Sequence, residues 1–155
     1  MPLYPGPATT GSLGLITPEQ VQQLEGLGEF GQEFQFEQDN DSSTTTSSTY
    51  QNKVTLTTSE LTSGSYILFY SYLSQGSKNN TVWESRVQFN GDNIVEAVQR
   101  AVVAGSTFLN AGHQVLPSVS GSQAFNIDWR RSGGSGNASI SNAHLTLFKI
   151  NPEGF

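Results

Sequence analysis

Two pairs of oppositely charged side chains have the spacing that side chains on one face of a β-strand would have. Glu84 stands two residues before Arg86, and Asp128 stands two residues before Arg130. Two carboxylates that flank a bound sugar can act as general acid and nucleophile in glycoside hydrolysis. Side chains two residues apart share one face of a strand, so the same spacing also suits cross-strand ion pairs on a solvated sheet. We favour the ion pairs, and we expect no enzymatic activity.

Residues that could bind a metal are few. The segment 37–43 places carboxylate or hydroxyl oxygens at alternate positions, as calcium-binding loops do, but it lacks the glycine turn and the distal glutamate of an EF-hand. We interpret it as a solvated acidic loop. His113 and His144 are the only histidines and there is no cysteine, so a zinc site would need carboxylates from other segments. We expect no bound metal and no cofactor.

Aromatic residues line one face of the strand-like segment 65–74. Tyr66, Tyr70 and Tyr72 alternate with an equally apolar set on the opposite face. The tyrosines are expected to form a second buried face or a subunit interface, and the alternative is a platform on which a glycan stacks. A strand that is apolar on both faces should be covered on both sides, which a monomeric two-sheet sandwich rarely provides. We therefore expect the chain to self-associate.

The charges are divided unevenly along the sequence. Lys53 is the first basic residue, and the net charge of -6 divides into -7 before it and +1 from Lys53 onward. A segment of one sign cannot neutralise itself, so it stays solvated or binds a basic surface. The seven carboxylates that precede Lys53 are Glu19, Glu25, Glu29, Glu33, Glu37, Asp39 and Asp41.

Residues 1–30 are predicted to form an extended N-terminal arm that carries one short helix. Residues 1–16 contain three prolines and three glycines and show no periodicity. Thr17 can cap a helix over residues 18–26, with Pro18 at its first position. Such a short helix is not stable alone, so its apolar face needs a surface to pack on. The arm residues expected to bind a partner are Leu3, Tyr4, Leu13, Leu15, Ile16, Val21, Leu24, Glu19 and Glu25.

Residues 31–155 are predicted to form one all-β domain, an antiparallel β-sandwich. From Glu33 onward the hydrophobic period is two, and turn signals such as Asn90-Gly91 separate the apolar runs. Many short strands without an internal helix favour a sandwich. The polar stretch 39–49 is a loop or an edge strand, and the segment 93–104 also has a spacing that suits a helix. The other expected strands cover residues 33–37, 51–58, 65–74, 81–90, 113–119, 123–131 and 138–150.

The last of these segments contains a break in its pattern. The apolar set changes phase between Ile140 and Ala143. One extra residue in the strand would produce this change, so the sequence predicts a β-bulge near Ser141 and Asn142. The alternation elsewhere predicts an interior formed by one face of each strand, which includes Ile67, Phe69, Leu73, Trp83, Val87, Phe89, Phe125, Ile127 and Trp129.

Composition restricts the class of protein. The 155 residues contain no cysteine, which excludes disulfides. No apolar run approaches about 20 residues and the N-terminus lacks the pattern of a signal peptide, so we expect no contact with a membrane. The acidic balance and the lack of a basic cluster argue against nucleic acid as a partner.

Four motifs, taken in their order, resemble the jelly-roll domains of tailed-bacteriophage virions. They are Leu61-Thr-Ser-Gly-Ser-Tyr-Ile, Arg86-Val-Gln-Phe-Asn-Gly, Asn110-Ala-Gly-His-Gln-Val and Ala138-Ser-Ile-Ser-Asn-Ala-His-Leu-Thr-Leu. The resemblance covers residues 55–150. The Gly- and Pro-rich start that leads into Thr17 also resembles the capsid- or tail-attachment end of such proteins.

This resemblance implies a structural virion protein, of the kind that forms a homotrimer. The favoured role is a capsid decoration, or cement, protein that binds the major capsid protein on the outside of a phage head through its arm. It would be made in the host cytoplasm and found on the capsid surface. The alternative is the receptor-binding tip of a tail or head fibre, which would bind a host glycan.

Overall fold

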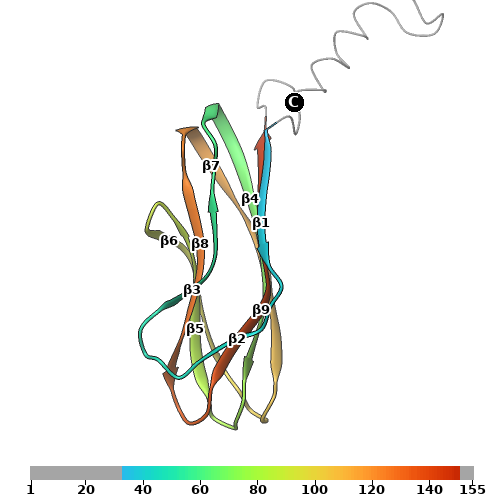
Figure 1. Ribbon diagram of the computed structural model, residues 1–155, viewed down its shortest axis with the longest axis vertical. Coiled ribbons are helices and arrows are strands. Elements are labelled where there is room, and N and C mark those ends of the chain that lie inside the picture. Colours follow the sequence, from blue (N-terminus) through green and yellow to red (C-terminus); the bar gives the residue numbers. More distant parts are fainter. Residues whose placement is uncertain (1–32, 151–155) are drawn as a thin grey trace, which may run out of the picture.

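In the computed structural model, residues 33–150 are described and form two antiparallel sheets that lie face to face (Figure 1). Sheet A contains, in order, β1 (Phe34–Asp39), β9 (Ala138–Ile150), β4 (Leu61–Gly76) and β7 (Thr107–Gly121), and the short β2 (Ser43–Thr45) also pairs with β9. Sheet B contains β3 (Gln51–Thr57), β8 (Ala124–Gly133), β5 (Val82–Phe89) and β6 (Asp92–Arg100). Within the described residues no helix is long and apolar enough to cross a membrane. The predicted arm and its helix over 18–26 lie outside the described residues.

The strand order is that of a jelly roll. With β2 set aside, sheet A takes the first, last, third and sixth of the remaining strands, and sheet B takes the second, seventh, fourth and fifth. The chain therefore crosses between sheets at every connection except β5–β6. That hairpin turns at Asn90 and Gly91, which both have positive φ (50° and 91°), as expected from the sequence.

The interior is filled from both sheets, and outside β4 it follows the alternation that the sequence predicts. In β4 the predicted inner face is wrong, because Tyr66, Leu68 and Tyr72 are buried and Phe69 is 43% exposed. Trp83, Val87, Phe125, Ile127 and Trp129 are buried on sheet B. On sheet A, β9 contributes Ala138, Ile140, Ala143, Leu145 and Leu147, all of them buried. Burial of large side chains from both inner faces is what holds the two layers together.

The predicted β-bulge in β9 is confirmed. Ser71 of β4 pairs with His144, and Leu73 pairs with Ser141, so two residues of β9 lie opposite Tyr72 alone. Asn142, the extra residue, has a φ of 49°. The bulge returns the following residues of β9 to the inner face, which explains the change of phase in the sequence.

Several predicted boundaries are corrected by the structure. The segment 93–104 is a strand, but it ends at Arg100, and β7 begins at Thr107 rather than at residue 113. The pair Ala111-Gly112 has a composition typical of a turn, but it lies inside β7. Gly112 pairs with Tyr70, whose ring occupies the space that a Cβ at position 112 would need. The glycine is therefore required for packing and not for a turn.

We predict that Asn142 is a sensitive position in this fold. Asn142→Gly should leave the free energy of unfolding unchanged, whereas Asn142→Val should lower it by about 2 kcal/mol, because a β-branched residue resists positive φ. Urea unfolding measures both effects. Thr146→Val, in the same strand but without positive φ, serves as the control. Equal stability of the Asn142→Val and wild-type proteins would contradict the bulge.

Candidate functional site

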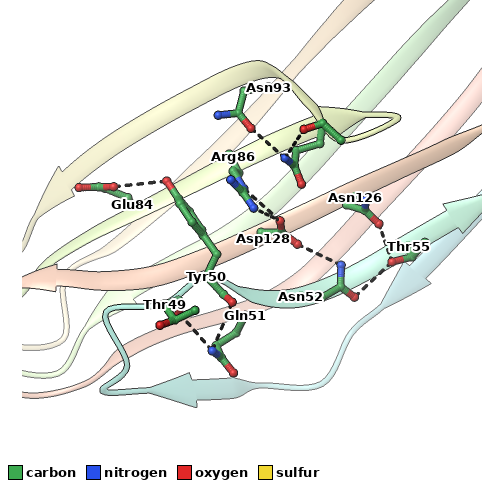
Figure 2. Close-up of polar contacts among 12 residues, drawn as sticks. Thr49, Tyr50, Gln51, Asn52, Thr55, Glu84, Arg86, Asn93, Asn126 and Asp128 are labelled. Atoms are coloured by element: carbon green, nitrogen blue, oxygen red, sulfur yellow. Dashed lines mark hydrogen bonds and ion pairs between the residues drawn. The ribbon is translucent and has the colours of Figure 1, made fainter.

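The outer face of sheet B carries rows of polar side chains that run across the strands (Figure 2). In the central row, Arg86 of β5 lies beside Asp128 of β8 and donates two hydrogen bonds to it, at 3.0 and 2.9 Å. Asn52 of β3 continues the row and donates to the other carboxylate oxygen of Asp128 at 3.1 Å. A parallel row joins Thr55 to Asn126 at 2.7 Å. The central row therefore links β5, β8 and β3 through the side chains of Arg86, Asp128 and Asn52.

A second ion pair lies in the neighbouring row. Arg130 donates through its Nε to Glu84 at 2.8 Å, and the Tyr50 hydroxyl donates to the same carboxylate at 3.3 Å. The guanidinium carbons of Arg86 and Arg130 lie 3.9 and 4.5 Å from the centre of the Tyr50 ring, a cation–π arrangement. The hydrogen bond from Arg130 holds the pKa of Glu84 below its ordinary value. The cross-strand ion pairs expected from the sequence are thus confirmed. The carboxylates of Asp128 and Glu84 each accept hydrogen bonds from an arginine.

The acidic segment 37–43 is organised around a lysine. A bulge in β3 between Asn52 and Val54 turns Lys53 into the protein, where its side chain is 0% exposed. Its ammonium lies 2.7 Å from an Asp39 carboxylate oxygen, and it donates to the Asp41 carbonyl at 2.7 Å. It also donates to the Ser43 hydroxyl at 3.2 Å. The Asp39 carboxylate, the Asp41 carbonyl and the Ser43 hydroxyl thus surround this ammonium, whereas the side chains of Glu37 and Asp41 do not contact it. The segment is largely exposed, as a solvated loop would be, but Lys53 anchors it to the sandwich.

A further cluster of polar side chains surrounds Glu33, the residue just before β1. The Glu33 carboxylate accepts hydrogen bonds from the Tyr66 hydroxyl and from the Thr62 amide, the latter at 3.1 Å, and it lies 3.7 Å from the Lys149 ammonium. Partial burial would raise the pKa of Glu33, but the hydrogen bonds from Thr62 and Tyr66 outweigh it and the pKa is lowered. Burial and the contact with Glu33 raise the pKa of Tyr66 to about 12.

These contacts show that part of the acidic run before Lys53 is neutralised by cations of the sandwich. Glu33 and Asp39 belong to the run of seven carboxylates, yet each is paired with a cation of the sandwich. Glu37 and Asp41 also lie in the described domain. The acidic run is therefore not one independent segment, and only Glu19, Glu25 and Glu29 remain in residues 1–32.

The predicted tyrosine stripe faces the interior of the sandwich. Tyr66 and Tyr72 are fully buried, and the Tyr72 hydroxyl lies 2.7 Å from the Ser85 hydroxyl of the opposite sheet. Tyr70 is half-buried and packs against the core. Of the alternatives expected for this stripe, a buried face is the one that Tyr66 and Tyr72 form, because sheet B covers both rings.

The opposite face of β4 is exposed and apolar. The register places its side chains in rows with those of β1, β9 and β7, and the rings of Phe34 and Phe148 (4.9 Å between centroids) and of Phe148 and Phe69 (5.9 Å) contact one another. We call this surface the apolar face; it comprises Phe34, Phe36, Ile67, Phe69, Leu73, Leu109, Val115 and Phe148. Five of its members are 43–70% exposed: Phe34 46%, Phe36 57%, Phe69 43%, Leu109 70% and Val115 47%.

No formal charge interrupts the apolar face. The residues that share its rows are Gln38, Ser71, Ala111, His113, Ser141, His144 and Thr146. Small side chains among them leave a hollow of about 440 Å³ beside Phe69, which both histidines border. In residues 33–150 there is no group of three or more Asp, Glu or His side chains placed to bind a metal. The face is therefore suited to contact with an apolar surface.

No protein-family model matches this sequence. No curated protein matches it either. Among solved structures, dimeric latent PorU from Porphyromonas gingivalis aligns with a TM-score of 0.50 and 9% identity over 77% of this chain, which is 13% of PorU. This similarity shows the fold alone.

Two further structures align less well. The VP2 subviral particle of infectious bursal disease virus gives a TM-score of 0.49 and 12% identity over 80% of this chain and 35% of VP2. The CBM36-1 domain of a multidomain xylanase, from the hindgut metagenome of Trinervitermes trinervoides, gives 0.34 and 15% identity over 73% of this chain and 74% of that domain.

We predict that the buried ammonium of Lys53 is needed for stability. Lys53→Met leaves the Asp39 carboxylate and the Asp41 carbonyl without this donor, and it should lower the free energy of unfolding by about 2 kcal/mol. Urea unfolding measures the loss. Lys78→Met, at an exposed lysine in the turn after β4, should change stability by less than about 0.5 kcal/mol. Equal effects of the two substitutions would contradict the role of Lys53.

We also predict a loss of stability in acid. The pKa values of Glu33, Asp39 and Glu84 are lower in the folded protein than their ordinary values of 4.5, 3.8 and 4.5, so the unfolded chain binds protons more tightly. Their contribution is present above about pH 4.5 and is lost as the pH falls through the folded-state values. The urea midpoint should therefore drop between pH 5 and 3, and less steeply in Glu84→Gln. A midpoint that stays constant over this range would be inconsistent with these contacts.

Proposed function

We propose that this chain is a structural assembly protein of a virus particle, a capsid decoration protein that acts through binding and not through catalysis. The observation that carries the proposal is the contrast between the two outer faces. Sheet B carries charged side chains on its outer face, four of which form two ion pairs between its own strands, whereas sheet A presents a broad uncharged apolar face. Exposed apolar patches of this kind mark sites of contact with other proteins.

The carboxylates that could have served a hydrolase are engaged. Asp128 accepts two hydrogen bonds from Arg86, and Glu84 accepts hydrogen bonds from Arg130 and Tyr50. A general acid needs a raised pKa, and that of Glu84 is lowered. A glycan-binding tip has less support, because Tyr66 and Tyr72 are inside the sandwich.

In this proposal, residues 1–30 bind the major capsid protein and the sandwich projects from the capsid surface. The apolar arm residues Leu3, Tyr4, Leu13, Leu15, Ile16, Val21 and Leu24 would be buried on the capsid, while Glu19 and Glu25 would meet basic groups. The Glu33 cluster supports this arrangement, since it ties the chain just after the arm to β4 through Tyr66 and to β9 through Lys149. A force on the arm would be carried into the middle of sheet A.

Deletion of the arm tests the proposal. A variant without residues 1–28 keeps Glu33 and the whole sandwich, so its urea midpoint should equal that of the full chain, but its co-sedimentation with capsids of the source particle should be lost. The double variant Glu19→Gln, Glu25→Gln should bind more weakly and with less dependence on salt. Glu60→Gln with Asp92→Asn, at exposed positions of the sandwich, is the charge-matched control. Undiminished capsid binding by the deletion variant would refute the role of the arm.

A further inference from the structure

We infer that the apolar face of sheet A binds the same face of a second copy of this chain and forms a two-fold symmetric pair. The inference extends the proposed structural role, and it depends on the sheet face and not on the arm. The pair would be a sheet-on-sheet contact in which the apolar rows of β1, β9, β4 and β7 lie against their counterparts.

The exposed area is large enough for a small interface. In the rows of Ile67 and Phe69, aromatic or branched side chains extend from Phe34 and Phe36 on the edge strand β1 to Val115 on β7. Four strands spaced at about 4.8 Å and about six residues of strand length give a footprint of roughly 400 Å² in projection. A specific interface buries about 800 Å² of accessible surface per partner, so this contact belongs to the small, dissociable class.

The lack of charge on the apolar face is compatible with a second copy as the occupant. A two-fold contact places residues near their own counterparts, so charged side chains on the face would meet like charges. The apolar face and the residues in its rows contain no Asp, Glu, Lys or Arg, although the chain carries a net charge of -6. The face can therefore pair with itself without electrostatic repulsion.

The same argument disfavours the arm as the cover of this face. Residues 1–32 contain Glu19, Glu25 and Glu29 and no lysine or arginine, and the apolar face offers these glutamates no cation. Lys149, at the rim of the sheet, is already in contact with Glu33 and Thr62. Charge complementarity between arm and face is thus absent.

The shape of the face is also self-complementary. It carries two projecting rings, Phe34 and Phe36, stacked at 5.6 Å between centroids, and it carries the hollow beside Phe69 where Ser71 and Ala111 are small. In a two-fold symmetric contact, the projection of each copy can enter the hollow of the other copy, so the same two features meet twice. A foreign partner would need only one of these features to match its own surface.

Sedimentation equilibrium of the full chain tests the inference. Between about 1 and 300 µM, the range in which small interfaces form, the mass of the wild-type protein should rise from 16.7 kDa toward twice that value. Phe69→Glu and, separately, Phe36→Glu should raise the Kd of the pair at least tenfold, because each places a carboxylate against an apolar surface. Val98→Glu, 70% exposed on the other sheet, is the matched control and should associate as the wild type does. The urea midpoint of each variant shows that it is folded.

Several results would overturn the inference. They are a monomer at every concentration, a trimer, or association of Phe69→Glu and Phe36→Glu that equals the wild type. Association that appears only after residues 1–28 are deleted would show that the arm covers the face instead. Failure of the pair is distinguishable from failure of the proposed function, because capsid binding is lost with the arm and the pair is lost with Phe69.

Discussion

A strand in a two-layer sandwich has one face in the interior and one face outside, and β4 is apolar on both. The interior takes Tyr66, Leu68 and Tyr72, which sheet B covers completely. Ile67 and Phe69 are then necessarily outside, where the described chain supplies no third layer. The exposed aromatic rows, the hollow beside Phe69 and the suitability of sheet A for contact with another molecule all follow from this constraint.

The charged residues of the sandwich have a different role. Arg86, Arg130, Lys53 and Lys149 each contact a carboxylate that comes from another strand or, for Glu33, from the residue just before β1. Exposed pairs of this kind contribute little to stability one by one, but they fix the positions of strands and chain ends. Lys53 is the exception in burial, and it holds the acidic loop against β3. The result is a domain whose charges serve its own architecture and whose apolar surface is left for partners.

Local patterns predicted much of the fold. The period of two in 125–129 gave the inner face of β8, the change of phase in 138–147 gave the bulge at Asn142, and Asn90-Gly91 gave the β5–β6 hairpin. Each of these features depends on neighbours in sequence, which a single sequence displays.

The remaining features depend on contacts between distant segments. Alternation alone predicted the wrong inner face of β4, because the two faces are equally apolar. The inner face is the one from which the Tyr72 hydroxyl contacts Ser85 on the opposite sheet. The contact of Lys53 with Asp39 requires a bulge in β3 that leaves no mark in the apolar pattern. The stacking of Tyr50 on two arginines joins a loop to two strands, and nothing near Tyr50 in the sequence announces it.

The central claim is that sheet A, and not sheet B, is the contact surface of this domain. Two-dimensional amide NMR spectra of the full chain, recorded over a series of concentrations, test it residue by residue. The account predicts shifts that depend on concentration and cluster in 34–38, 67–73, 109–115 and 144–148, with β5, β6 and β8 unchanged. Shifts that cluster on sheet B instead, or spectra that do not change with concentration, would contradict it.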